Sequence, residues 1–332
     1  MLRSLNSGVS AMQQFQQSMD VIGNNIANVN TTGYKGARID FADAFSQTLS
    51  SGAGGVSMQI GTGVGTNAIT NQFIQGAITN TGTNTDLAVS GSGFFMVRDS
   101  LSGADFATRD GSFHVDANGY LVTSGGLRVQ GFNDSNLTTR GDVIINADDI
   151  RVTRIADANT AVTAAQAAVT AAQAAVNAAD PNDQAAVDAA NAQLAAANAQ
   201  LEDAQDSLTS AQGLKVSSFN IDIEGKVNVR LNDGTEYVRG QVLLQNFQNP
   251  KALAKEGNNL FSGIAGAGPL SQIEAPGTNG LGKIQSGALE MSNVDLANQF
   301  SSLITTQRAF QASARIISTS DEILQELVNL KR

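Results

Sequence analysis

Apolar residues recur with a heptad period near the end of the chain, and this repeat constrains the fold more than any other sequence feature. The positions of this repeat are alternately four and three residues apart, which is the period of a coiled-coil seam. They are Leu296, Phe300, Leu303, Gln307, Phe310, Ala314, Ile317, Asp321, Leu324 and Val328. Gly and Pro are absent from Ala288 to Arg332, and Ser292 or Asn293 can cap the start of the helix. The pattern predicts a helix of about 35 residues, roughly 50 Å long, and a seam of that length needs a partner.

A second heptad pattern lies at the opposite end of the chain. It consists of Leu2, Leu5, Val9, Met12, Gln16, Met19, Gly23 and Ile26, with Phe15 and Ile22 widening the stripe. Two such helices can pair with each other, but a coiled coil of two helices seldom buries a wide apolar stripe completely. We therefore expect the remaining apolar surface to be buried against other copies, in a polymer or bundle whose core is built from the termini. The alternative is an ordinary helical hairpin that closes one domain.

The segment after the N-terminal helix indicates a helix stop and a turn. Residues 24–32 are rich in Asn, which is a poor helix former, and Gly33 can take the left-handed conformation that ends many helices. We expect the next run, Phe41–Leu49, to be a short helix or an extended arm. The Gly/Ser-rich stretch Ser50–Thr66 is typical of a mobile loop.

Two blocks of the sequence have the pattern of β-strands. The first block, residues 67–147, contains short apolar runs separated by turn signals such as Asp110-Gly111 and Asn118-Gly119, and residues 116–120 predict a hairpin. The second block begins at Lys215 and ends before Pro250. Because each block alone has few strands, we expect the two to form one body.

An Ala-rich segment of low complexity, residues 157–212, separates these blocks. Apolar residues seven positions apart predict helices on both sides of a break at residues 180–183, where Pro181 stops one helix and Asp183 can cap the next. The repeated residues are Val162, Val169 and Val176, followed by Val187, Leu194, Leu201 and Leu208. The pattern predicts an antiparallel helical hairpin inserted into the body, and a disordered linker is the alternative.

The net charge of −10 is concentrated in the same segment. Seven acidic residues and no Lys or Arg occur between residues 157 and 212, so this segment carries −7 of the total. We interpret the charge as solvation of the segment rather than attraction to a basic partner. The lack of a basic cluster with interleaved aromatic residues argues against nucleic-acid binding. No apolar run reaches the roughly 18 residues of a membrane-spanning helix, and the N-terminus lacks the continuous apolar region of a secretory signal.

Residues with catalytic chemistry are few and isolated. The chain contains no Cys, which excludes thiol nucleophiles and thiolate metal ligands, and its one histidine, His114, lies in a strand-like run. Gly61, Gly63 and Gly65 lack the spacing of a phosphate-binding loop. The sequence therefore predicts no catalytic residue, no cofactor and no metal site.

Motifs near both ends carry a family resemblance. The N-terminal run 19–35 reads MDVIGNNIANVNTTGYK, and the C-terminal runs 287–296 and 307–311 read GALEMSNVDL and QRAFQ. Shorter matches are TDLAV at 85–89 and TRDGSF at 108–113. These sequences resemble the axial proteins of the bacterial flagellum, which are the rod, hook and hook-associated subunits. The motif residues are Asn24, Asn25, Ala27, Asn28, Gly33, Ser292, Asn293, Val294, Gln307 and Arg308.

Within this family the chain resembles hook subunits most, through residues 292–296 and the ending 327–332. Residues 59–64 also resemble the distal rod subunit, which is the alternative. The resemblance covers the chain except residues 157–212 and implies no role for that insertion.

The resemblance implies a subunit exported through the flagellum's own channel that polymerises helically into a hollow, bendable tube. Its implied partners are further copies of the chain and neighbouring axial proteins: the distal rod, the hook-associated proteins and the hook cap. The implied location is the hook and basal body, outside the cell after export. The residues expected at the polymer interface are Leu2, Leu5, Val9, Met12, Met19, Ile22, Ile26, Leu296, Phe300, Leu303, Phe310, Ile317, Leu324 and Val328.

The predicted fold class is α+β, with terminal heptad helices paired as a coiled coil, a β-rich central body and an inserted Ala-rich antiparallel helical hairpin. The terminal helices, residues 1–30 and 286–332, would form the inner axial core. The body would comprise residues 31–156 and 213–285, and the hairpin residues 157–212. Besides a structural axial subunit, two other hypotheses stay open: a secreted adhesin or binding module, and an enzyme.

Overall fold

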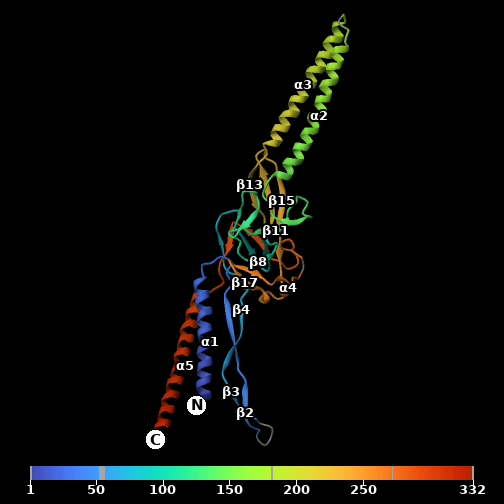
Figure 1. The fold of residues 1–332 in the computed structure, drawn as a ribbon. Helices are drawn as coiled ribbons and strands as arrows, with labels where there is room; N and C mark the ends of the chain where they lie inside the picture. The colour runs from blue at the N-terminus through green and yellow to red at the C-terminus, as the bar shows by residue number, and fades with distance from the viewer. Residues whose placement is uncertain (1, 52–56, 181, 271, 331–332) are drawn as a thin grey trace.

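The computed structural model of the chain describes residues 2–51, 57–180, 182–270 and 272–330. Its fold is mixed α+β and the molecule is elongated, with the β-strands gathered in the middle (Figure 1). One pair of long helices projects from one end of this body, and a second pair extends from the other end, where both chain termini lie (Figure 1). The long helices are α1 (Leu2–Ala27), α2 (Asp148–Ala178), α3 (Gln184–Gln212) and α5 (Leu296–Leu330).

The Asn-rich run ends α1, as the sequence predicts. The side chain of Asn28 donates hydrogen bonds to the carbonyl oxygen and to Oδ1 of Asn24, each at 2.9 Å, so the motif caps its own helix end. Gly33 follows with φ +65°, and a Cβ at this position would lie 2.5 Å from the backbone nitrogen of Asp110. A side chain is therefore excluded both by the backbone conformation and by the body against which the turn packs.

The start of α5 differs from the expectation. Neither Ser292 nor Asn293 caps the helix, because the carboxylate of Asp295 accepts the backbone N–H groups of Ala297 and Asn298, at 2.9 and 3.3 Å. An acidic residue also suits the positive end of the helix dipole. Asn293 instead forms hydrogen bonds with residues from the N-terminal part of the chain.

A long β-ribbon follows α1 and lies alongside it (Figure 1). The stretch Phe41–Leu49 is extended rather than helical, and the predicted loop at 50–66 is wrong over its described part. Two antiparallel pairs make the ribbon, and their pairing satisfies the backbone groups that a loop would expose to solvent. The first pair is β1 (Ala37–Asp43) with β4 (Val64–Asn71), and the second is β2 (Ser46–Ser51) with β3 (Ser57–Gly61). Residues 52–56 of the expected loop lie outside the described residues.

Strands from both predicted β blocks pair directly in a 12-stranded sheet, through β11 and β15 at Gly131 and Val242. The predicted hairpin at residues 116–120 is confirmed, since Leu121 pairs with Val115. The strands of this sheet are β7 (Phe94–Arg98), β8 (Asp105–Thr108), β9 (Phe113–Val115), β10 (Leu121–Thr123), β11 (Arg128–Phe132), β12 (Arg140–Asp142), β13 (Val216–Ile221), β14 (Lys226–Leu231), β15 (Glu236–Val242), β16 (Leu244–Gln245), β17 (Ala254–Gly257) and β18 (Leu260–Ser262).

The interior of the body is apolar. Phe95, Leu121 and Leu244 are fully buried in its main cluster, and a second cluster forms around Phe94 and Phe261. The short helices η1 (Pro250–Ala252) and α4 (Ile264–Ala267) lie beside this second cluster. Burial of this apolar area drives the folding of the body.

Two small antiparallel sheets return the chain to its N-terminal half before α5 begins. The pairs are β6 (Leu87–Ser90) with β19 (Lys283–Ser286), and β5 (Ile78–Asn80) with β20 (Ala288–Glu290). The strand pairing brings residues 288–290 beside residues 78–80, so that both terminal segments leave the body at the same place.

Helices α2 and α3 lie side by side along buried alanines seven residues apart, and they form the projection that we call the arm, residues 148–212 (Figure 1). The side chain of Asp183 accepts the N–H of Ala186 at 3.3 Å, as a helix cap does. Helix α2 begins at Asp148, ahead of the segment expected from Asp157, because Asp148 and Asp149 occupy its first turn. The buried residues are Ala158, Ala165 and Ala172 in α2, and Ala190, Ala197, Ala204 and Ala211 in α3.

The arm offers a test of this packing. Ala197 is 7% exposed in α3, whereas the adjacent Ala196 is exposed. Replacing Ala197 by Glu forces a charge into the helix contact and should cost about 1–3 kcal/mol locally. Hydrogen exchange of the full chain should show faster exchange of the amides in α2 and α3, with the body unchanged.

Ala196→Glu is the matched control, because it adds the same side chain to the same helix on the solvent side. Equal loss of protection in both variants would contradict the alanine contact.

Candidate assembly interface

Helices α1 and α5 pack against each other in opposite directions. Near the body, Asn25 donates a hydrogen bond from Nδ2 to Oε1 of Gln299 at 3.3 Å. At the far end, Gly8 lies against α5, where an added Cβ would come within 3.3 Å of Cγ1 of Ile317 and 3.6 Å of the carbonyl oxygen of Ser313. Glycine thus permits the close approach of the two helices.

The inward face of α5, which packs against α1, contains every second residue of the predicted heptad seam. Leu303, Phe310, Ile317 and Leu324 are half-buried against α1, and they are spaced by seven residues. The positions between them on this face are polar, and Ser313 and Ser320 are each only 7% exposed. Small residues therefore form half of the contact. They stand one position before the predicted seam residues Gln307, Ala314 and Asp321.

Large apolar side chains of α5 remain in solvent on its other faces. Several of them belong to the predicted polymer interface, while Ile304, Ile316 and Ile323 were not in that prediction. The exposed fractions are Leu296 40%, Phe300 49%, Ile304 52%, Ile316 48%, Ile323 50% and Val328 67%. Large apolar side chains that a helix leaves exposed are typical of a docking face.

The predicted residues of α1 are distributed differently. Ile22 is only 7% exposed, so it belongs to the packed side of the helix. Leu5, Val9, Met12, Met19 and Ile26 are half-buried, and the side chain of Leu2 lies outside the described residues. The structure thus brings part of the predicted interface together within one copy and leaves the rest open.

The β-ribbon covers a further side of α1. The rings of Phe15 and Phe41 meet edge to face with centroids 6.5 Å apart. The hydroxyl of Thr66 donates to Gln14 and, at 2.5 Å, to Gln17, so polar contacts continue along the same side. The helix pair and the ribbon therefore form one extended unit below the body (Figure 1).

A buried ion cluster joins this unit to the body, and we call Lys35, Arg109 and Glu290 the joint cluster. Nζ of Lys35 lies 2.6 Å from Oε1 of Glu290, and Nη1 of Arg109 lies 3.1 Å from Oε2. The side chains are 1%, 6% and 0% exposed for Lys35, Arg109 and Glu290. One carboxylate therefore neutralises two cations away from water.

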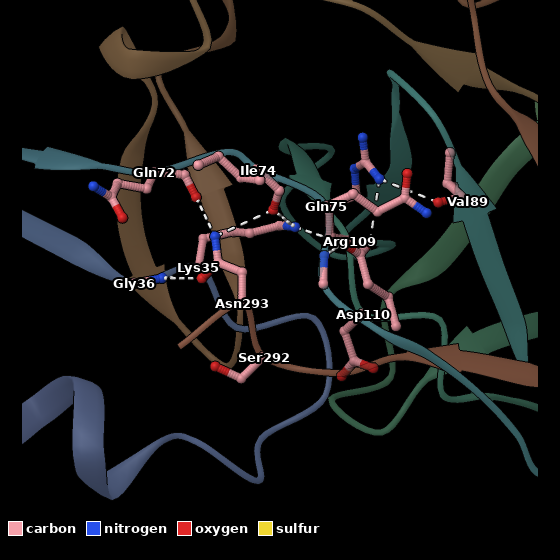
Figure 2. Close-up of polar contacts among 12 residues, drawn as sticks. Lys35, Gly36, Gln72, Ile74, Gln75, Val89, Arg109, Asp110, Ser292 and Asn293 are labelled. Atoms are coloured by element: carbon pink, nitrogen blue, oxygen red, sulfur yellow. Dashed lines mark hydrogen bonds and ion pairs between the residues drawn. The ribbon is translucent and has the colours of Figure 1, made fainter. Parts of the chain in front are cut away.

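Backbone groups complete the bonding of the joint cluster, as Figure 2 shows in part. Lys35 also donates to the carbonyl oxygen of Ile74 at 2.8 Å, and Arg109 donates to that of Gly91 at 2.7 Å. The N–H of Gly76 donates to Oε1 of Glu290 at 2.8 Å. Such bonds are what a buried charge requires.

The guanidinium of Arg109 is not fully satisfied. Its Nε has no hydrogen-bond partner among the described residues, while the guanidinium carbon lies 5.2 Å from the centroid of the Phe94 ring. The ring supplies a weaker cation–π contact on that side.

Two motif asparagines hold the chain segments beside the cluster. Oδ1 of Asn25 accepts the hydroxyl of Tyr34 at 3.2 Å and the N–H of Ala37 at 2.9 Å. Asn293 accepts the N–H of Gly36 at 2.9 Å and donates to the carbonyl oxygen of Gln72 at 2.7 Å (Figure 2). The motifs from the two ends of the sequence thus bind each other.

The other motif residues lie in different parts of the structure. Ser292 accepts the N–H of Val294 at 3.3 Å, and the Val294 side chain lies against Gly36. Ala27, Gln307 and Arg308 are exposed, so the fold of one copy does not account for them.

Burial sets the electrostatics of the joint. It lowers the pKa of Lys35 below its ordinary value, although the charge and the hydrogen bond of Glu290 oppose this shift. Burial also lowers the pKa of Arg109, again against the effect of Glu290. Nearby, burial lowers the pKa of Lys255, whose ammonium lies 4.3 Å from the centroid of the Tyr34 ring.

The joint cluster was not predicted from the sequence. Each member was visible inside a recognised motif, as Tyr34-Lys35-Gly36, Thr108-Arg109-Asp110 or Leu289-Glu290-Met291. A charged residue inside such a motif is a weak signal of a buried ion, and its partner cannot be identified without the fold.

His114 is exposed on β9, and the described residues hold no cluster of acidic or histidine side chains that could bind a metal ion. Among the described helices, none is both long and apolar enough to cross a membrane. The surfaces that remain to be explained are those of the terminal helices.

Flagellar sequence families match most of these regions. Residues 5–35 match the "Flagella basal body rod protein" family and residues 285–330 the "Flagellar basal body rod FlgEFG protein C-terminal" family. Residues 88–171 match the "Flagellar hook protein FlgE/F/G D1 domain". The terminal matches include most of α1, all of α5 and two members of the joint cluster, Lys35 and Glu290.

Whole-chain relatives decide the assignment. The flagellar basal-body rod protein FlgG of Bacillus subtilis is 35% identical over 339 residues, and the flagellar hook protein FlgE of Borreliella burgdorferi is 32% identical over 444 residues, each covering 100% of both chains. The chain belongs to the flagellar rod and hook family. The hook protein FlgE of Helicobacter mustelae is 48% identical over 145 residues, covering 41% of this chain and 32% of that protein. Members of this rod and hook family are structural parts of the flagellar hook and basal body.

The joint cluster predicts a large stability effect. Glu290→Gln keeps the side-chain shape but leaves Lys35 and Arg109 buried without a counter-charge, which should cost about 3–5 kcal/mol. Urea unfolding of the full chain measures this loss in the free energy of unfolding.

Asp105→Asn is the control, because Asp105 pairs with Arg98 at 2.6 Å on the surface, where the side chains are 40% and 44% exposed. Such a pair contributes about 0–1 kcal/mol. Equal effects of the two substitutions would show that the cluster does not hold the terminal segments to the body.

Proposed function

We propose that the chain is a structural subunit of the flagellar hook, which polymerises helically into a hollow, bendable tube and transmits motor torque to the filament. The exposed apolar surface of α5, which one copy leaves unburied, is the observation that carries this proposal. Open-ended contacts between copies give a helical polymer rather than a closed oligomer.

In this proposal α1 and α5 pair as a coiled coil and line the inner axial core. The contacts between copies would involve the exposed part of the predicted interface, chiefly Leu296, Phe300 and Val328. The half-buried members, such as Met12 and Met19, would contribute the surface that the partner helix leaves uncovered. Support comes from the fit of one side of each helix to its partner and from the apolar character of the remaining sides.

The proposed domains follow the same division. Residues 1–30 and 286–332 would be the axial core, residues 31–156 and 213–285 the β-rich body outside it, and residues 157–212 an inserted Ala-rich antiparallel hairpin. The arm lies at the end of the molecule opposite the termini, so it would point away from the tube axis (Figure 1). Both terminal segments leave the body at the same place, and this supports the division between core and body.

The proposed partners are further copies of the chain and, at the two ends of the polymer, the distal rod, the hook-associated proteins and the hook cap. The function is mechanical, and we propose no enzymatic activity, no nucleic-acid partner and no membrane insertion.

A distal rod subunit is the second candidate. The alignment with the Bacillus subtilis rod protein spans 339 residues for a chain of 332, so gaps in this chain occupy few alignment positions, whereas the alignment with the Borreliella hook protein spans 444. The higher identity of the Helicobacter hook protein over a shorter region favours the hook. An adhesin or binding module is less well supported, because the largest exposed helix surface is apolar along its length rather than hollowed around a ligand.

Assembly provides the test of the proposed function. Phe300→Gln combined with Ile323→Gln removes two large apolar side chains from the open faces of α5 without touching its contact with α1. Electron microscopy at high protein concentration should show tubes for the unaltered chain and none for this variant. Curved tubes are expected for a hook subunit and straight tubes for a distal rod subunit.

Val152→Gln is the matched control, since Val152 is 64% exposed at the base of the arm. This control should form tubes as the unaltered chain does. Tubes from the α5 variant would mean that the exposed face is not the polymer contact.

A further inference from the structure

The charged residues of α5 are segregated along the helix. After the capping Asp295, the described part of α5 carries two arginines, Arg308 and Arg315, and then three acids, Asp321, Glu322 and Glu326. All five side chains are exposed, and none forms an ion pair with another described residue. Lys331 and Arg332 follow in the sequence and lie outside the described residues.

Four of these charges, Arg308, Arg315, Glu322 and Glu326, are on the side of α5 that faces away from α1, whereas Asp321 directly follows the buried Ser320 and lies near the edge of the contact with α1. Arg308, Arg315 and Glu322 are spaced by seven residues, so they lie in one stripe. Each follows an inward residue, Leu303, Phe310 or Ile317, by five positions, which is a rotation of about 140° around the helix. The stripe is therefore nearly opposite the contact with α1.

Exposed apolar residues lie beside the stripe. Phe300 and Ile304 precede Arg308 by eight and four residues, and Ile316 and Ile323 directly follow Arg315 and Glu322 in the sequence. A surface with an apolar flank and ordered charges combines the two properties that drive and orient protein association.

We propose that this face docks on α5 of a second copy of the chain that runs parallel to it and is shifted along the helix axis. In this arrangement Arg308 and Arg315 of one copy lie beside Glu322 and Glu326 of the next. The inference rests on the proposed function and deepens it, because it sets the axial stagger between neighbouring subunits.

The charge order requires the shift. A parallel copy at the same height would place arginine beside arginine and acid beside acid, which is unfavourable. The arginines precede the outward-facing acids by 7 to 18 residues, between Arg315–Glu322 and Arg308–Glu326. At the helical rise this corresponds to a shift of roughly 10–27 Å. Each copy then offers acids to one neighbour and arginines to the other, so the contact continues without closing.

Charge reversal tests the register. One variant carries Arg308→Glu and Arg315→Glu, and the other carries Glu322→Lys and Glu326→Lys. Each variant alone brings like charges together, and the free-subunit concentration left after pelleting should rise about tenfold or more, which equals 1.4 kcal/mol or more of contact energy. An equimolar mixture should pellet as the unaltered chain does, because alternating copies restore opposite charges at every contact.

The control for net charge is Lys251→Glu with Lys283→Glu, two exposed lysines of the body. This control should pellet as the unaltered chain does. Polymer formation by the arginine variant alone, or failure of the mixture to recover, would overturn the stagger.

The outcomes also separate this inference from the proposed function. Tubes from the unaltered chain and from both reversal variants would leave the axial subunit intact and remove the charge register. Recovery of the mixture as a closed dimer, measured by light scattering, would mean antiparallel pairing and would also overturn the inference. No tube from the unaltered chain would remove both.

Discussion

The burial of a single carboxylate, Glu290, is the constraint on which the arrangement of the whole chain depends. Its two cations, Lys35 and Arg109, come from segments far apart in the sequence, and all three side chains are almost completely removed from water. A buried charge without its partner is costly, so none of the three segments can adopt this position alone. The terminal helices and the β body are therefore coupled: the connection between them forms only when both ends of the chain are in place.

The same joint provides a route for mechanical load. The two terminal segments leave the body side by side, and Asn25 and Asn293 bind backbone groups of the turn and ribbon between them. Force on α1 or α5 therefore acts on several short, charge-assisted or backbone hydrogen bonds at once, rather than on one flexible linker. A subunit that transmits torque from its core to its body needs such a connection, since a loose linker would absorb the rotation.

The sequence predicts elements whose signal is local and misses those that depend on distant partners. Heptad spacing located α1, α5 and the arm, and turn residues such as Asn118 and Gly119 located the hairpin of the body, because periodicity and turn chemistry act over a few residues. The ribbon was missed because its Gly and Ser residues resemble a loop until cross-strand pairing fixes them. The joint cluster was missed for a similar reason: whether Lys35 is solvated or buried depends on residue 290.

The small residues in the contact between α1 and α5 explain why the subunit should polymerise at all. Gly8, Ser313 and Ser320 are buried where the helices meet, so the axes approach closely, while larger residues of this contact such as Phe310 and Ile317 are only half-buried. Large side chains such as Phe300 and Ile323 are left on the open faces. Hydrophobic stabilisation scales with apolar area buried, at about 25 cal/mol per Å², so most of it becomes available only when another copy covers those faces. In the proposed polymer, the pairing within one copy would orient the helices, and contact between copies would supply most of the stabilisation of the axial core.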